Sequence, residues 1–158
     1  MPEFRIRDLA HLAVLGRALA SCLREAPSLR CILLRGDLGS GKTTLTRLLV
    51  NTLPGGDRAE ISSPSFTLCN VYPTTPPVCH CDLFRAGSAV PDEISEILDA
   101  GDMAMVVEWA EHLPVAWLPH EFLDICLQVC EDSILVRIEI HSPNSAQLAV
   151  LLQVVQSI

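Results

Sequence analysis

The sequence is poor in lysine and has no cluster of basic residues. Among 158 residues there is one lysine, Lys42, and the ten arginines are scattered along the chain. The formal net charge at pH 7 is −8. A protein that binds nucleic acid by itself needs clustered lysine and arginine to neutralise phosphates, so this composition argues against a free-standing nucleic-acid binder. If tRNA or another RNA takes part in the function, we expect it to do so only indirectly, through a partner protein.

Long hydrophobic runs are also missing, although 49% of the residues are apolar. The longest uninterrupted apolar runs have about five residues, whereas a membrane-spanning helix needs about 20. Residues 1–5 lack the basic-then-apolar pattern of a secretion signal. These features predict a cytoplasmic protein with no membrane contact, whose surplus apolar area is covered by a protein partner.

No two cysteines have the C-x-x-C spacing that is typical of zinc sites. Cys79 and Cys81 stand two residues apart in a strand-like segment, so their thiols should share one face and His80 the other. An odd number of cysteines, in a chain with no export signal, predicts reduced and buried side chains. We therefore expect neither disulfides nor a zinc site. The seven cysteines are Cys22, Cys31, Cys69, Cys79, Cys81, Cys126 and Cys130.

The sequence does contain a complete phosphate-binding pattern, and the sole lysine is part of it. Residues 36–43 read Gly-Asp-Leu-Gly-Ser-Gly-Lys-Thr and match G-x-x-x-x-G-K-[ST]. A short apolar segment precedes them and a helical pattern follows. In this context the glycines let backbone N–H groups close around a polyphosphate at the positive end of a helix. We expect Lys42 to reach the β- and γ-phosphates of a nucleoside triphosphate and the Thr43 hydroxyl to bind Mg²⁺.

Helical and strand-like patterns alternate along the whole chain and predict an α/β fold. Residues 1–158 are expected to form a single P-loop NTPase-like domain, with a mixed central sheet flanked by helices, because hairpin-like pairs of strands occur among β–α crossovers. Four helices are predicted. The first starts after the capping residue Asp8 and ends before Pro27, and the second covers residues 43–53. The third starts at Pro91, and the fourth covers residues 145–158. The predicted strands cover residues 31–34, 66–72, 78–84, 105–107, 122–129 and 134–140.

Hydrolysis of a triphosphate needs more than the loop, because an acid must hold Mg²⁺ or its waters and a group must orient the attacking water. Such an acid usually ends a buried apolar strand beside the loop. Glu108 follows the apolar run at residues 105–107, and Asp82 ends the strand-like segment that starts at Val78. Both are candidates, although solvated acids at strand ends are common too.

Two further features allow more than one interpretation. Residues 63–67 place hydroxyls about 20 residues after the loop, where segments that sense the γ-phosphate tend to lie. Alternatively, Ser63 stabilises a turn that enters a strand. Trp109 either stacks on adenine or packs in the core.

Taken together, these segments resemble the TsaE (YjeE) family, small P-loop ATPases of bacterial threonylcarbamoyladenosine modification of tRNA. Besides the loop and Thr44, the matching segments are S-P-S-F-T-L from Ser63, H-C-D-L-F-R from His80 and V-E-W-A-E from Val107. They occur in the family's order and approximate spacing and cover roughly residues 5–140.

The resemblance implies roles for the matched positions. Lys42 and Thr43 would serve the phosphates and Mg²⁺, Glu108 would give a second metal contact, and Asp82 would be needed for ATP turnover. Lys42, Asp82 and Glu108 are thus the expected catalytic residues. The family acts with a TsaB–TsaD pair, where ATP hydrolysis is thought to reset the complex between rounds of carbamoyl transfer. The expected nucleotide-binding residues are Gly36, Asp37, Leu38, Gly39, Ser40, Gly41, Lys42, Thr43, Thr44 and Trp109.

Of the other functions of a phosphate-binding loop, a small-molecule kinase and a scaffold without turnover remain as alternatives, and a guanine-specific switch does not. A small-molecule kinase needs an acceptor pocket and usually a lid that brings arginines over the phosphate, and residues 55–63 are too few for such a lid. A guanine-specific switch normally needs an N-K-x-D segment, which a chain with one lysine inside the phosphate loop does not contain. A nucleotide-binding scaffold without turnover leaves no separate mark in a sequence.

Overall fold

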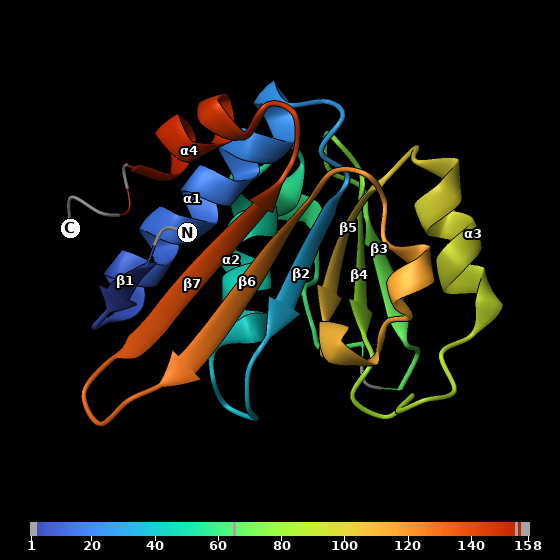
Figure 1. The fold of residues 1–158 in the computed structure, drawn as a ribbon, viewed down its shortest axis with the longest axis horizontal. Helices are drawn as coiled ribbons and strands as arrows, with labels where there is room; N and C mark the ends of the chain where they lie inside the picture. The colour runs from blue at the N-terminus through green and yellow to red at the C-terminus, as the bar shows by residue number, and fades with distance from the viewer. Residues whose placement is uncertain (1–2, 65, 154, 156–158) are drawn as a thin grey trace.

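The computed structural model describes residues 3–64, 66–153 and 155, and a seven-stranded sheet forms its centre (Figure 1). Along the sheet the strands follow the order β1-β7-β6-β2-β5-β4-β3. The strands are β1 (Glu3–Ile6), β2 (Cys31–Arg35), β3 (Cys69–Tyr72), β4 (Val78–Asp82), β5 (Ala104–Glu108), β6 (Phe122–Val129) and β7 (Ile134–His141).

The sheet is mixed, as the sequence predicts. Strands β4, β5, β2 and β6 are mutually parallel neighbours. Strand β7 runs antiparallel to β6 and β1, and the edge strand β3 runs antiparallel to β4. The carboxyl ends of β2, β4 and β5 therefore lie at one edge of the sheet, where ligands bind in open α/β sheets.

Helices cover both faces of the sheet (Figure 1). The helices α1 (Leu9–Glu25), α2 (Lys42–Thr52) and α4 (Ser145–Gln153) pack on one face and share its apolar core. The other face is covered by α3 (Asp92–Ala100) and by the short 3₁₀ helices η2 (Ala110–His112) and η3 (Val115–Trp117). A third 3₁₀ helix, η1 (Gly56–Arg58), follows α2.

Burial explains the character of the central strands. Every residue of β4 and β5 is buried, as are the first four residues of β2. A parallel strand that is covered on both faces favours a continuous apolar run over an alternating one. The polar residues that interrupt these runs, His80, Asp82 and Glu108, are therefore buried among apolar neighbours and need partners inside the protein.

The predicted helix starts are confirmed where they can be compared. Asp8 precedes α1, and its Oδ1 accepts a hydrogen bond of 2.8 Å from the His11 N–H. Helix α2 starts at Lys42, within the phosphate-loop pattern and one residue before the predicted start, and α3 starts after Pro91. Helix α4 ends at Gln153, and the rest of its predicted range falls largely on residues 154 and 156–158, which lie outside the described residues.

The main differences between the predicted and observed strands concern β1, the start of β3 and the end of β4. Strand β1 was not predicted, because its four residues lie at the edge of the sheet and only one of them is buried. Strand β3 starts three residues later than predicted, because the chain turns at Leu68, whose φ is 68° and whose N–H donates to the Pro64 carbonyl at 2.7 Å.

The prediction of seven reduced, buried cysteines was wrong. Cys69 and Cys81 form a disulfide between β3 and β4, because the antiparallel register places the two residues directly opposite each other. Cys126 and Cys130 are only partly buried. The prediction that Cys79 and Cys81 share one face is confirmed, since their sulfur atoms lie 3.7 Å apart.

Within the described part of the chain, no helix has the length and apolar character that are needed to cross a bilayer.

Candidate nucleotide-binding site

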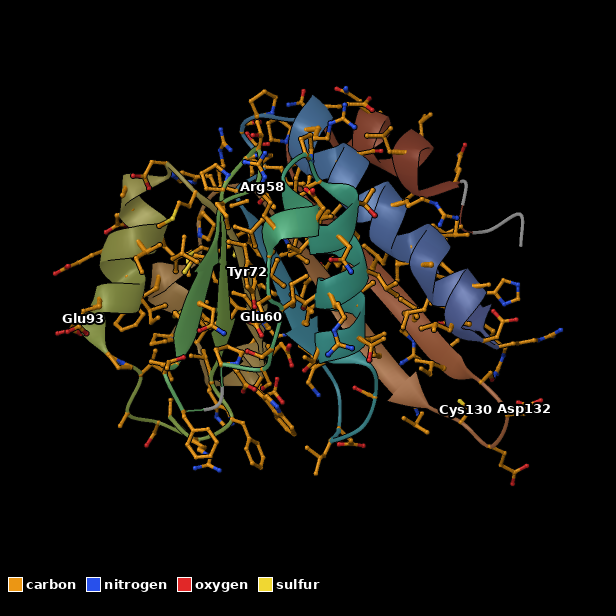
Figure 2. All side chains as sticks on the ribbon, turned by 180° about the vertical axis from the view of Figure 1, so that it is seen from behind. Arg58, Glu60, Tyr72, Glu93, Cys130 and Asp132 are labelled. Carbon is orange, nitrogen blue, oxygen red and sulfur yellow. A yellow bond between two sulfur atoms is a disulfide. The ribbon has the colours of Figure 1, made fainter. Side chains whose placement is uncertain are left out.

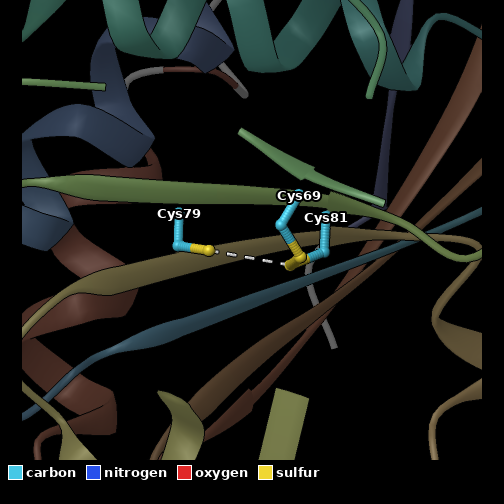
Figure 3. A group of neighbouring side chains, drawn as sticks. All are labelled: Cys69, Cys79 and Cys81. Atoms are coloured by element: carbon cyan, nitrogen blue, oxygen red, sulfur yellow. Dashed lines mark hydrogen bonds between the residues drawn. A yellow bond between two sulfur atoms is a disulfide. The ribbon is translucent and has the colours of Figure 1, made fainter. Parts of the chain in front are cut away.

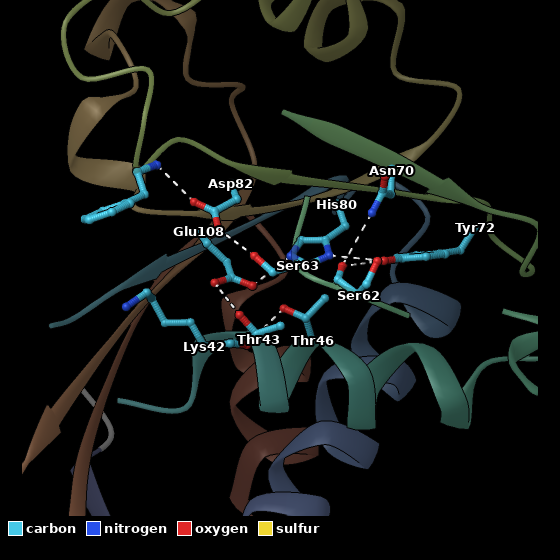
Figure 4. Close-up of polar contacts among 11 residues, drawn as sticks. Lys42, Thr43, Thr46, Ser62, Ser63, Asn70, Tyr72, His80, Asp82 and Glu108 are labelled. Atoms are coloured by element: carbon cyan, nitrogen blue, oxygen red, sulfur yellow. Dashed lines mark hydrogen bonds and ion pairs between the residues drawn. The ribbon is translucent and has the colours of Figure 1, made fainter. Parts of the chain in front are cut away.

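The predicted phosphate loop joins β2 to α2 at the carboxyl edge of the parallel strands (Figure 4). Gly36 has a φ of 136°, and a Cβ there would collide with the carbonyl oxygen of Leu127. Gly41 has a φ of 98° and forms the N-cap of α2 without a side-chain hydrogen bond. Both positions require glycine, and the first N–H groups of α2 have no acceptor within the helix. The loop thus offers an anion-binding helix start.

Lys42 lies at the first position of α2 with only 5% of its surface exposed. Its Nζ donates to the carbonyl oxygens of Gly36 at 2.6 Å and Asp37 at 2.8 Å, and contacts the Ser40 hydroxyl at 3.4 Å. The same ammonium lies 4.2 Å from the centre of the Trp109 ring. The charge of Lys42 is therefore held against the loop itself.

The pKa of Lys42 is lowered from its ordinary value, because burial disfavours the charged ammonium. The carboxylates of Glu108, Glu111 and Asp82 act in the opposite direction and partly offset this effect. These carboxylates therefore favour a cation at the position of Lys42.

Asp82 and Glu108 end the adjacent strands β4 and β5 and are paired in register. Asp82 Oδ2 accepts a hydrogen bond of 3.0 Å from the Ser63 hydroxyl, and its Oδ1 accepts one of 2.9 Å from the Phe84 N–H. The second bond ends β4 two residues earlier than the sequence pattern predicts. Because parallel strands end at one edge, two acids separated by 26 positions in the sequence lie beside the loop.

Glu108 connects the loop to the interior of the sheet (Figure 4). It is 2% exposed, and its Oε2 accepts a hydrogen bond of 2.9 Å from the Thr43 hydroxyl. Its Oε1 lies 2.7 Å from Nε2 of His80, which is completely buried. Nδ1 of His80 lies 3.3 Å from the Tyr72 hydroxyl, which donates to the Ser62 carbonyl at 3.2 Å. Both Glu108 oxygens are thus oriented by protein groups.

The loop and the two acids border one cavity of about 240 Å³. Of the predicted site residues, only Gly36 and Asp37 are not part of its lining, and both contribute their carbonyl oxygens to Lys42. The cavity is lined by Leu38, Gly39, Ser40, Gly41, Lys42, Thr43, Thr44, Ser63, Asp82, Phe84, Glu108 and Trp109. The structure therefore brings the three predicted catalytic residues together.

A second cavity of about 420 Å³ adjoins the first and shares Gly39, Gly41 and Thr44 with it. Its wall is largely apolar and includes Leu12 of α1 and Ile134 of β7. The turn between β6 and β7, on which Figure 2 labels Cys130 and Asp132, contributes to the lining of this cavity. The sequence did not point to this cavity, because its lining comes from segments more than 120 residues apart.

The oxygen-rich lining fits a hard divalent cation. The Thr43 hydroxyl and the Glu108 carboxylate meet at 2.9 Å, and the Asp82 carboxylate lines the same cavity. Oxygen ligands of this kind suit Mg²⁺, which usually takes one or two protein groups together with phosphate oxygens and water. The residues present therefore fit the metal that the loop pattern implies.

The structure also places the residues with open roles. Trp109 lines the cavity, partly buried, with its ring centre 4.8 Å from that of Phe84. Arg85 lies over the Phe66 ring at 4.4 Å, and Arg137 donates to Glu3 Oε2 at 2.8 Å. Neither arginine belongs to the described lining of the two cavities.

His80 contacts Glu108 in the candidate site, although the sequence predicted no separate role for it. The strand alternation contained the signal, since His80 and Asp82 are two positions apart and share one face of β4. What the sequence did not show is the partner, because Glu108 lies on a different strand.

Comparisons with known proteins show the family and the fold of the chain. The family model described as "Threonylcarbamoyl adenosine biosynthesis protein TsaE" matches residues 6–137. A protein from Streptomyces coelicolor named "tRNA threonylcarbamoyladenosine biosynthesis protein TsaE" is 39% identical over 103 residues, which are 61% of this chain and 66% of that protein. Proteins with the same name are 43% identical over 82 residues in Aquifex aeolicus and 37% identical over 118 residues in Synechocystis.

The matched stretches differ in how much they cover. They span 51% of this chain and 57% of the Aquifex protein, and 71% of this chain and 72% of the Synechocystis protein. The chain thus spans slightly less than two thirds of the length of the Streptomyces relative and little more than half of the Aquifex relative.

A solved structure shows the same fold. The crystal structure of Bacillus subtilis YdiB superimposes with a TM-score of 0.69 at 22% identity, over 96% of this chain and 93% of that one. The seven-stranded mixed sheet, the phosphate loop and the flanking helices form a P-loop NTPase-like fold. Because the family model covers most of the sequence, the chain belongs to the TsaE family.

Proposed function

We propose that this protein binds MgATP and hydrolyses it as an accessory subunit in threonylcarbamoyladenosine modification of tRNA. The observation that carries the proposal is the meeting of Lys42, Asp82 and Glu108 around one cavity at the start of α2. Burial of two carboxylates and a lysine costs free energy, and a loop with a purely structural role does not require it. Such clusters are typical of functional sites.

The loop residues would hold the phosphates. The N–H groups at the start of α2 and the Lys42 ammonium supply positive charge along one side of the cavity. Lys42 would exchange its hydrogen bonds to the loop carbonyls for bonds to the β- and γ-phosphates. This exchange keeps the ammonium paired, which a partly desolvated cation needs.

Thr43 and Glu108 would hold Mg²⁺ or its water ligands. When bound, the metal supplies Lewis-acid stabilisation of the charge that develops on the phosphate oxygens. The protein's contribution is orientation, because His80 and Thr43 fix the two oxygens of Glu108 in separate directions.

Asp82 would orient the attacking water. Ser63 and the Phe84 N–H hold the carboxylate in place, so it enters the reaction with little rearrangement. Ser63 is the first residue of the segment at residues 63–67, whose position after the loop is typical of γ-phosphate sensors. Because Ser63 donates a hydrogen bond to Asp82, a movement of this segment would change the position of Asp82 and so the rate of hydrolysis.

The second cavity would receive the nucleoside. It continues from the loop through Gly39, Gly41 and Thr44, and its apolar wall suits a flat aromatic base. Trp109 lies instead beside Lys42, so it would flank the phosphate end of the nucleotide. Arg7 and Asp8 at the rim offer polar groups to the sugar or base.

The names of the relatives support the place in tRNA modification. The net charge of −8 disfavours direct contact with tRNA, so tRNA would enter through TsaB- and TsaD-like partner proteins. Exposed Leu38 and Phe84 at the cavity rim leave apolar area that a partner can cover.

Phosphate release from ATP and Mg²⁺, measured with and without the partner proteins, tests the proposal. We expect slow release by the protein alone and faster release with the partners. Calorimetry with a non-hydrolysable ATP analogue separates binding from turnover. Absence of binding by folded protein, alone and with partners, would refute the nucleotide site. Transfer of phosphate to a metabolite would instead support a small-molecule kinase.

A further inference from the structure

Three sulfur atoms meet on the face of β4 opposite to His80 and Asp82 (Figure 3). Cys69 and Cys81 are paired across β3 and β4 with their Cα atoms 4.2 Å apart, and they are joined by the disulfide. Cys79 Sγ lies 3.7 Å from Cys81 Sγ, and all three sulfur atoms lie within 4.8 Å of one another. The proposed nucleotide chemistry uses none of them.

The surroundings of these thiols favour a neutral bond over a bound metal ion. Cys79 and Cys81 are completely buried in the same apolar cluster as Leu33 and Val107. Burial raises the pKa of the Cys79 thiol to about 11. Three thiolates around a divalent ion would carry net negative charge into this cluster, whereas a disulfide carries none. Among the described residues, no histidine or carboxylate joins the group as a fourth ligand.

The two ends of the disulfide differ in burial. Cys69 is only partly buried, and β3 is a four-residue strand at the edge of the sheet with β4 as its only neighbour there. We therefore expect a small thiol to attack at Cys69, because it is the least buried of the three cysteines and Cys79 and Cys81 are completely buried.

We propose that Cys69 and Cys81 form a reversible thiol–disulfide site, opened by small dithiols and closed by small disulfides. In opening, a thiolate of the dithiol attacks the Cys69 sulfur, and Cys81 leaves and takes up a proton. The second thiol of the dithiol then closes a disulfide within the reagent and frees Cys69 as a thiol. In closing, a small disulfide is reduced to two thiols while Cys69 and Cys81 lose two electrons and two protons.

The bond lies next to the groups that hold Asp82. Cys81 directly precedes Asp82, and the Asp82 N–H donates to the Leu68 carbonyl at 2.9 Å, one position before Cys69. The disulfide therefore fastens β3 to the strand end that carries Asp82. Opening it should loosen the edge strand and lower thermal stability. The disulfide closes a loop of about a dozen residues, and the unfolded chain gains conformational entropy when this loop is opened.

Thiol counting on the whole protein tests the site. The protein is equilibrated with oxidised glutathione or with dithiothreitol. It is then denatured in the presence of N-ethylmaleimide, which alkylates free thiols, and its mass is measured. We expect five alkylated cysteines after oxidation and seven after reduction, with peptide mapping placing the bond between Cys69 and Cys81. The melting temperature should be about 5–10 °C higher in the oxidised sample.

Variants assign the effect to this pair. Cys69→Ser should abolish the difference in melting temperature between oxidised and reduced samples, and Cys79→Ser should keep it. Cys126→Ser, a partly buried cysteine on β6, is the matched control and should also keep it. Cys81→Ser, at the buried end of the disulfide, should also abolish the difference in melting temperature. If Cys81→Ser does not fold, Cys69→Ser at the sheet edge still gives the answer.

Seven alkylated cysteines after both treatments would overturn the proposal, as would a bond that maps to other cysteines. Binding of Zn²⁺ by the reduced protein at or below micromolar concentration, lost in Cys69→Ser, would replace it with a metal site. Phosphate release can be measured in the same samples, and we expect it to differ several-fold between the two states. That last comparison rests on the proposed function, whereas thiol counts and melting temperatures do not depend on ATP turnover.

Discussion

The parallel centre of the sheet and its antiparallel side make different contributions to the candidate site. In the centre, β2, β5 and β4 end at one edge and place Lys42, Glu108 and Asp82 around the phosphate loop. On the other side, β1, β7 and the β6–β7 turn supply the apolar wall of the second cavity. The charged side chains of the candidate site thus lie where the strands are buried on both faces, whereas the more exposed side of the sheet contributes apolar lining to the second cavity.

The difference follows from how each region satisfies its polar groups. Glu108 and His80 are buried and orient each other, so loss of either leaves a polar group without its partner. Arg137 and Glu3 form an ion pair on the surface, where water can replace either partner. Substitutions in the two regions should therefore differ in both size and kind of effect.

The largest effect is expected for Lys42→Ala in the parallel centre. Lys42 would supply charge-assisted hydrogen bonds to phosphate, each worth about 1.5–3 kcal/mol, so ATP affinity should fall by roughly 100-fold and turnover should be lost. Calorimetry and phosphate release measure both quantities. The melting temperature of the variant serves as the control for folding. Retained turnover would show that the loop lysine does not serve the phosphates.

Asp82→Asn and Glu108→Gln should lower turnover by roughly 100-fold or more while ATP affinity changes less, because these groups act mainly in the transition state. The two variants should differ in their response to magnesium. Glu108→Gln should need a higher Mg²⁺ concentration for half-maximal turnover, and Asp82→Asn should not. Normal turnover in both variants would contradict the assigned catalytic roles.

A smaller and different effect is expected for His80→Ala. The variant leaves buried Glu108 without one partner, and we expect the free energy of unfolding to fall by about 1–3 kcal/mol. Urea unfolding measures this loss. In a double-mutant cycle with Glu108→Gln, the two losses should not add, because both variants remove the same contact. Strict additivity would show that the hydrogen bond of 2.7 Å does not couple them.

The smallest effect is expected on the antiparallel side, for Arg137→Ala. Glu3 raises the pKa of Arg137 through their hydrogen bond, but the guanidinium is solvated and already fully charged at neutral pH. The melting temperature should change by less than about 1 °C, and ATP affinity should not change. A clear loss of ATP affinity would place Arg137 at the nucleotide and remove the contrast between the two regions.

The features predicted correctly from the sequence depend on neighbours along the chain. Asp8 caps α1 through a bond to a residue three positions away, and the phosphate loop is one continuous octamer. The predicted hairpins and the mixed sheet followed from alternating patterns separated by short turns. Strand β1 escaped prediction because an edge strand of four residues buries too little to leave a pattern.

The features that were missed depend on which strands become neighbours. The disulfide between Cys69 and Cys81 contradicts the expectation from cysteine number and context, since the register of one hairpin decides it. The bond between His80 and Glu108 needs β4 beside β5, and the second cavity needs β7 beside α1 and the loop. A local sequence pattern does not show which strands become neighbours, so it does not predict these contacts.

The sequence by itself determined the phosphate loop, because backbone conformation around Gly36 and Gly41 is a local property of residues without a Cβ. It also indicated that Asp82 and Glu108 lie at or near the ends of buried strands. Only the tertiary structure decided that Asp82 and Glu108 are paired in register, that Thr43 and His80 hold the two oxygens of Glu108, and that two cysteines are bonded. These contacts are set by strand order and register, which arise from packing of the whole core.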